Sequence, residues 1–88
     1  MPYIKQEFRD DLDEVVSQLE DALLEVPTEQ IDGRMNYFIT KALTRVYGDR
    51  YFEHNRAIGL LECVQQEYYA RRVRPYEDEK IKENGDVF

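Results

Sequence analysis

The sequence is poor in the residues that crosslink or interrupt small proteins. It has one cysteine, one histidine and no tryptophan, and its 88 residues include only three prolines and four glycines. A single cysteine excludes an internal disulfide, and one histidine beside it leaves no ligand set for a structural zinc ion. We therefore expect no metal, no cofactor and a reducing, cytoplasmic setting. Stability must then come from helix packing, from a partner chain or from both.

Long apolar runs are also absent. None approaches the ~20 residues that cross a bilayer, and the first residues, Met1 to Asp11, are charged throughout, unlike a signal peptide. The formal net charge of -7 disfavours a phosphate backbone as a partner. We expect neither a membrane nor duplex nucleic acid to be bound.

The charge is unevenly distributed along the chain. Residues 1–32 carry a net charge of -8, residues 33–74 carry +4, and residues 75–88 carry -3. One interpretation is internal complementarity between an acidic first helix and the basic segment after it. The other is a basic surface that meets an anion.

The apolar spacing predicts an all-α fold, a small three-helix bundle in a single domain. Residues 1–6 form an arm tucked against a helix end, residues 7–26 the first helix and residues 34–47 the second. A connector, TEQIDG at residues 28–33, separates these two helices.

The third helix is the longest and is predicted over residues 49–74. Gly48 and Asp49 supply the stop and the N-cap before it, and Pro75 is expected to end it. Its apolar side chains spread beyond one face, so it needs neighbours on more than one side. Self-association into a homo-oligomer meets this need, and the alternative is coverage by the other helices and the tail within a monomer.

The last segment, residues 75–88, is charged yet ends in two large apolar residues. We predict an extended tail, anchored through Tyr76, Ile81, Val87 and Phe88 onto helices of this chain or of a neighbour. A frayed terminus is the alternative.

No constellation of catalytic groups has a workable spacing, so we expect no enzyme. His54 and Cys63 are nine positions apart on one helix, about 13 Å along its axis. Glu62 and Glu67 share no helix face for a di-metal site, and the glycines form no phosphate loop. Gly59, inside a helix, indicates a close approach of another backbone.

Two groups of residues remain as candidate ligand-binding positions. The first combines amide and tyrosine side chains of the second and third helices, either as an internal hydrogen-bond network or as a pocket for a planar ligand. The second combines arginines and tyrosines near residue 74, either neutralised by Glu77, Asp78 and Glu79 or converging on a phosphate-bearing molecule. The candidates are Asn36, Tyr37, Gln65, Tyr68, Tyr69, Arg71, Arg72, Arg74 and Tyr76.

Three stretches also resemble a family of short uncharacterised proteins of bacteriophages and prokaryotes. They are GRMNYFITKAL at Gly33 to Leu43, IGLLECVQQEYYARRVRPYED at Ile58 to Asp78, and KIKENGDVF at Lys80 to Phe88. The resemblance implies an all-helical protein encoded by a phage or prophage. It brings no assigned reaction and no catalytic residues.

The favoured function is a non-enzymatic, homo-oligomeric helical binding protein in the cytoplasm of a bacterial host. It would act stoichiometrically on a host protein or a small anionic, phosphate-bearing ligand. One alternative is a sponge that sequesters a nucleotide immune signal in pockets between subunits. Others are an acidic nucleic-acid mimic, through the acids of the first helix, and a structural accessory protein.

Overall fold

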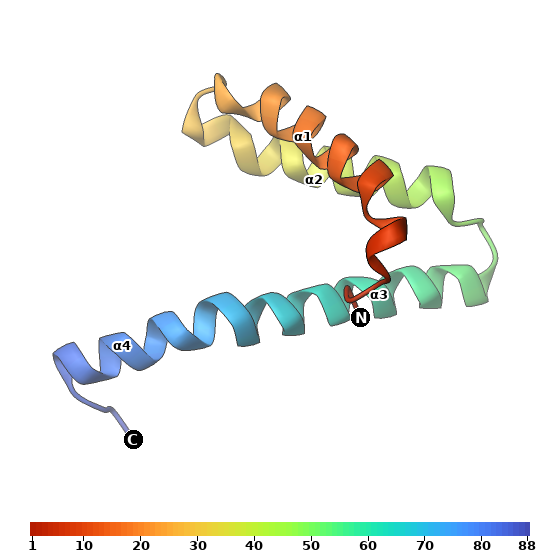
Figure 1. Ribbon diagram of the computed structural model, residues 1–88. Helices are drawn as coiled ribbons and strands as arrows, with labels where there is room; N and C mark the ends of the chain where they lie inside the picture. The colour runs from red at the N-terminus through yellow and green to blue at the C-terminus, as the bar shows by residue number, and fades with distance from the viewer.

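The computed structural model describes all 88 residues and contains helices and turns but no β-strand. A 3₁₀ turn (Gln6–Phe8) precedes α1 (Asp10–Leu24), and α2 (Thr28–Val46) follows. Then α3 (Tyr51–Tyr68), a π-helical turn (Tyr69–Val73) and α4 (Arg74–Asn84) run on as one rod (Figure 1). The predicted all-α class, with a long last helix, is confirmed.

The first helix is shorter than the predicted range of 7–26. Three acids, Asp10, Asp11 and Asp13, lie in the first turn of α1, where carboxylates stabilise the positive end of the helix dipole. The helix ends at Leu24, three residues before Pro27.

The second helix begins six residues earlier than predicted, so the expected connector at residues 28–33 is wrong. Pro27 is the N-cap of α2, with φ -56° and ψ 143°, and its carbonyl accepts the Gln30 N–H at 2.9 Å. A proline immediately before Thr28 starts the helix there, and Gly33 is accommodated inside it.

The third helix begins at Tyr51, with Arg50 rather than Asp49 as its N-cap. The Arg50 backbone N–H donates to Glu53 Oε2 at 3.5 Å. A side chain at Gly48 would collide with the Glu53 carboxylate, so glycine leaves the space that this carboxylate occupies.

The prediction that Pro75 ends the helix is wrong. Proline lacks an N–H, and its ring clashes with the carbonyl four residues earlier in a regular α-helix. The π turn widens the helix just before this point: the Arg74 N–H donates to the carbonyl of Tyr69, five residues back. The rod therefore continues through Pro75, and residues 75–84 of the predicted extended tail are helical.

The rod ends at Gly85, whose φ of 92° favours glycine. Beyond it, Val87 and Phe88 are 89% and 114% exposed. Docking of these two side chains onto the chain's own helices is therefore excluded, and docking on a neighbour stays a prediction.

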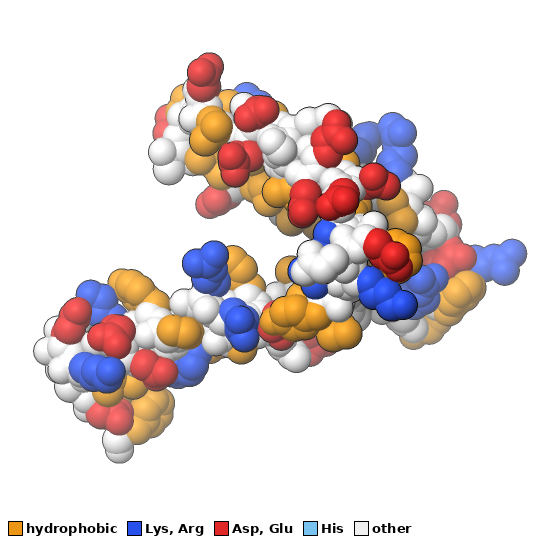
Figure 2. Space-filling view, viewed as in Figure 1, with side chains coloured by type: hydrophobic (Ala, Val, Ile, Leu, Met, Phe, Trp, Pro, Cys, Tyr) orange, Lys and Arg blue, Asp and Glu red, His pale blue; other side chains and the backbone are white.

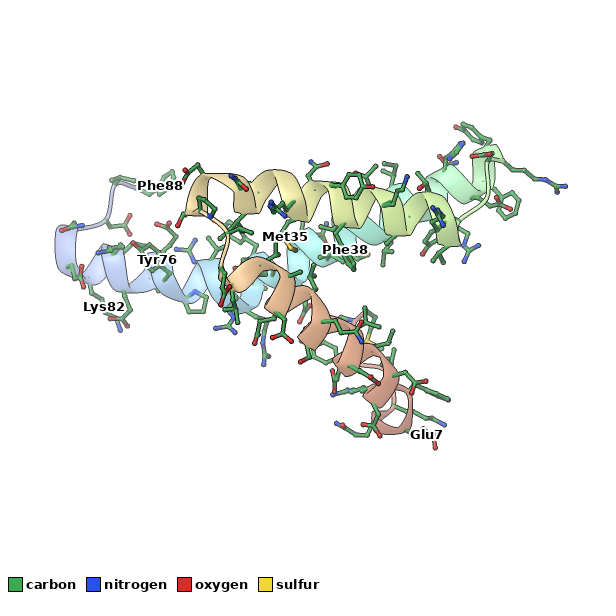
Figure 3. The ribbon with its side chains drawn as sticks, turned by 90° about the horizontal axis from the view of Figure 1, so that it is seen from above. Glu7, Met35, Phe38, Tyr76, Lys82 and Phe88 are labelled. Atoms are coloured by element: carbon green, nitrogen blue, oxygen red, sulfur yellow. The ribbon has the colours of Figure 1, made fainter.

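The helices do not close into the predicted bundle. Figure 1 shows the rod running back beneath the α1–α2 pair, and Figure 3 shows α1 and α2 diverging from their common turn. The segments in closest contact are neighbours in sequence, such as α3 with the π turn and the π turn with α4. No residue of the chain is buried.

The radius of gyration and the accessible surface also show that the chain is not compact. The radius of gyration is 16.7 Å, whereas a compact chain of this length has about 12 Å. The accessible surface is 8248 Å², whereas a compact monomer of this mass exposes about 5,500 Å². The chain thus exposes about 2,700 Å² more than such a monomer.

Gly59 lies inside α3 with no atom within 4 Å of the place where a Cβ would stand. The close backbone approach that we predicted there is absent within a single chain. None of the helices has both the length and the apolarity that a bilayer crossing requires.

Replacing Gly33 by alanine should stabilise the fold. Gly33 is helical and nothing lies within 4 Å of an added Cβ, so Gly33→Ala should raise the free energy of unfolding by about 0.5–1 kcal/mol. Urea unfolding at fixed protein concentration measures it. The control, Gly85→Ala, should lower stability because of the positive φ. A loss of stability in Gly33→Ala would contradict an open position at residue 33.

Candidate functional site

The nine predicted ligand-binding residues lie on separate parts of the fold. Asn36 and Tyr37 are in α2, Gln65 and Tyr68 in α3, and Arg74 and Tyr76 in α4, while the π turn holds the other three, Tyr69, Arg71 and Arg72. The structure gathers some of them and separates the rest.

The α2 pair does not join the others. Asn36 Oδ1 accepts the Thr40 hydroxyl at 3.2 Å, and Lys41 Nζ lies 5.8 Å from the centre of the Tyr37 ring. Tyr37 lines a shallow cavity formed by α2 alone. The predicted hydrogen-bond network between the second and third helices is therefore not formed in this chain.

The α4 pair is also engaged locally. Arg74 Nε lies 3.0 Å from Asp78 Oδ1, and Lys80 Nζ lies 5.6 Å from the centre of the Tyr76 ring. For Arg74, this is the local neutralisation that was one of our two interpretations. All three ion pairs of the chain lie in α4, so Arg71 and Arg72 have no carboxylate partner.

The N-terminal arm crosses the middle of the rod rather than a helix end (Figure 1). The Tyr3 hydroxyl donates to the Glu67 carboxylate of α3. Arg9 Nε donates to the Ile4 carbonyl at 2.9 Å and ties the arm to the first helical turns.

A cavity of about 340 Å³ lies between the arm and the rod, near the lower end of the range for small-molecule sites. Three charged residues line it: Glu67, Arg71 and Arg72. The rest of the lining is apolar or aromatic: Met1, Pro2, Leu60, Cys63, Val64 and Tyr68. An apolar floor beside two unpaired guanidinium groups suits a ligand with an apolar body and an anionic group.

A second, almost wholly apolar depression of about 320 Å³ lies on the adjacent side of the rod. It is lined by Gln65, Tyr68 and Tyr69, together with Leu61, Val64 and Val73. Tyr68 and Val64 border both cavities. Five of the nine predicted residues therefore line two adjoining cavities rather than one site: Arg71 and Arg72 the first, Gln65 and Tyr69 the second, and Tyr68 both.

Sequence reasoning missed the contribution of the arm and of two α3 residues, Leu60 and Cys63, that were not among the nine candidates. They form the cavity floor because the arm lies over them. The available signal was the apolar start of the chain, which we placed against a helix end.

The Glu67 carboxylate changes the pKa of the Tyr3 hydroxyl that it contacts. The hydrogen bond to Glu67 raises the pKa of Tyr3 above its ordinary value of 10.0, with desolvation and the Glu67 charge acting in the same direction and Arg71 opposing them. Because the pKa is raised in the folded state, this contact stabilises arm docking below pH 10.0 and is lost as pH rises through the higher pKa.

The site brings no catalytic set together. Cys63 is an exposed free thiol in the cavity, and His54 is not among the cavity residues. No three His, Cys, Asp or Glu side chains are grouped in a way that could hold a metal ion.

Three helices without a strand, and an open cavity between an N-terminal arm and the rod, define a small all-α protein. The chain belongs to the family described as Domain of unknown function (DUF6899), whose sequence model matches residues 1–87. No curated protein matches the chain, and no solved structure matches it.

Replacing Tyr3 should remove a titration step from the alkaline absorbance profile. Subtracting the tyrosinate absorbance of Tyr3→Phe from that of the wild-type protein isolates the signal of Tyr3. The midpoint of this difference should lie above pH 10.0 because Glu67 favours the protonated phenol. In a Glu67→Gln background the same difference should move down toward the ordinary pKa. A wild-type difference centred at or below pH 10.0 would contradict the contact.

Proposed function

We propose that this chain is a non-enzymatic, homo-oligomeric helical binding protein that acts stoichiometrically on a host protein or a small anionic ligand. We place it in a phage or prophage and in the cytoplasm of the bacterial host. The observation that carries the proposal is that three ordered helices leave every residue at least partly exposed.

The exposed surface is large enough for a permanent interface. A standard interface takes about 800 Å² from each partner, and obligate ones take more. The surplus of about 2,700 Å² over a compact monomer exceeds that requirement. Self-association is therefore supported by area as well as by composition.

The exposed apolar side chains belong to all three helices rather than to one patch. On α1 they include Val15 and Val16, on α2 Phe38 and Ile39, and on the rod Ile58. Figure 2 shows such side chains along both the α1–α2 pair and the rod, with acidic side chains over α1 and α2. Copies that cover one another's helices would build the core that one chain lacks.

The partner is expected where copies join, near the arginine pair. Arg71 and Arg72 lie at a cavity that has aromatic and apolar walls, and neither has a carboxylate partner. Guanidinium groups in such a setting recognise phosphate or carboxylate groups. The same observation favours a second candidate function, a sponge that holds a nucleotide immune signal between subunits.

The first test is the mass in solution. Light scattering during size-exclusion chromatography should give a multiple of the 10.6 kDa chain mass, because the lone chain has no core. Replacing half-exposed apolar residues, as in Phe38→Ser with Ile39→Ser, should lower that mass or unfold the chain.

The control for the mass test is Lys82→Ser, at a charged side chain of α4 that is 73% exposed, which should leave the mass unchanged. A well-folded species of 10.6 kDa at all concentrations would overturn the proposal.

The second test is ligand stabilisation. A panel of linear and cyclic nucleotides is screened by thermal unfolding, and a bound member should raise the midpoint by several degrees. Arg71→Ala with Arg72→Ala should abolish the shift, whereas Arg74→Ala should retain it, because Arg74 is already paired with Asp78. An equal shift in the double variant would dismiss the arginine pair, and no shift with any nucleotide would dismiss the sponge.

A further inference from the structure

The residues after the rod expose two large apolar side chains. Gly85 turns the chain back beside the rod, where residues 85–88 border an open cavity with Glu77 and Ile81 of α4 (Figure 1). The Phe88 N–H donates to Asp86 Oδ1 at 2.8 Å, which shapes residues 85–88 into a small turn. Val87 and Phe88 keep 89% and 114% of their surface exposed, and Figure 3 shows Phe88 standing away from the rod. We call residues 85–88 the tail segment.

The cavity between the arm and α3 has apolar and positively charged residues that complement the tail segment. Its apolar floor includes Leu60, Cys63 and Val64, and Arg71 and Arg72 lie beside it without carboxylate partners. Glu67 also lines the cavity, where its carboxylate accepts the Tyr3 hydroxyl, so the charged lining is net positive. The tail segment presents two apolar side chains and the Asp86 carboxylate, which complement this cavity in polarity and charge.

The tail segment cannot enter the cavity of its own chain. Val64 and Asn84 are 20 residues apart on the continuous rod, which separates them by about 30 Å. Four extended residues span at most about 14 Å. Only a different molecule can bring a tail segment to this floor.

We infer that, in the homo-oligomer, the tail segment of a second copy occupies the cavity between the arm and α3. Val87 and Phe88 contact the apolar floor, and Asp86 lies toward Arg71 and Arg72. This inference rests on the proposed self-association and names the partner of that same site, a second copy of the chain.

The arrangement is reciprocal when two rods pair antiparallel. A two-fold axis beside the rod, between Val64 and Asn84, brings each tail segment to the other cavity at once. It also sets the basic π turn of one copy against the acidic end of the other rod, residues 75–88. Two such contacts draw on the surplus of about 2,700 Å², which exceeds what a stable dimer needs.

The single native cysteine gives a direct test, because Cys63 lies in the cavity floor. In a chain with one cysteine appended after Phe88, which keeps Val87 and Phe88, mild oxidation should link the appended cysteine to Cys63 of another copy, since docking brings the two Cα atoms within disulfide range. The product should run as a dimer on a non-reducing gel. Peptide mass spectrometry on mixed light and heavy isotope-labelled chains should find the Cys63 peptide of one label joined to the tail peptide of the other.

Two controls separate docking from random oxidation. Cys63→Ala in the chain with the appended cysteine should lose this crosslinked peptide. Lys82→Cys, at a 73% exposed side chain of α4, should not link to Cys63. Independently, Val87→Ser with Phe88→Ser should raise the dissociation constant of the oligomer at least about tenfold, and Lys82→Ser should leave it unchanged.

Failure of the tail inference and failure of the proposed self-association give different results. An oligomeric mass without the Cys63 to tail crosslink, or with a serine variant that dissociates no more readily, overturns the tail inference and leaves self-association standing. A link between two cysteines of one chain also overturns it. A folded monomer overturns both the inference and the proposed function.

Discussion

Burial is the constraint on which the rest of this structure depends. Ordering the backbone costs about 1–2 kcal/mol per residue, and apolar burial is the main term that offsets it. Here the helices are formed, yet the chain buries none of its residues. Local helix hydrogen bonds rarely maintain segments of this length alone in water. The exposed apolar side chains of all three helices are therefore the surface that the proposed self-association would cover.

The sequence predicted the helical class but not all of the boundaries. The spacing of apolar residues located α1, α2 and the rod because that signal is local. The beginning of α2 was missed because Pro27 can either break a chain or start a helix, and only the backbone conformation decides. Pro75 was taken as an end because the widening of the helix at Tyr69–Val73 has no pattern of its own.

The candidate site was predicted only in part, for a different reason. Tyr68, Arg71 and Arg72 meet at one cavity because they lie on one stretch of helix, so sequence distance was a good guide. The contact between Tyr3 and Glu67 joins residues 64 positions apart. Such a contact depends on where the arm lies in three dimensions, and apolar spacing along a helix says nothing about that.

The absence of buried residues also affects how the protein behaves in a cell. In the proposed homo-oligomer each chain is covered by other copies, so mass action would raise the folded fraction with the amount made. Scarce copies would then be open to proteases, whereas abundant copies would protect one another. The quantity of active protein would grow more steeply than its synthesis, a response with a threshold and without any separate regulator.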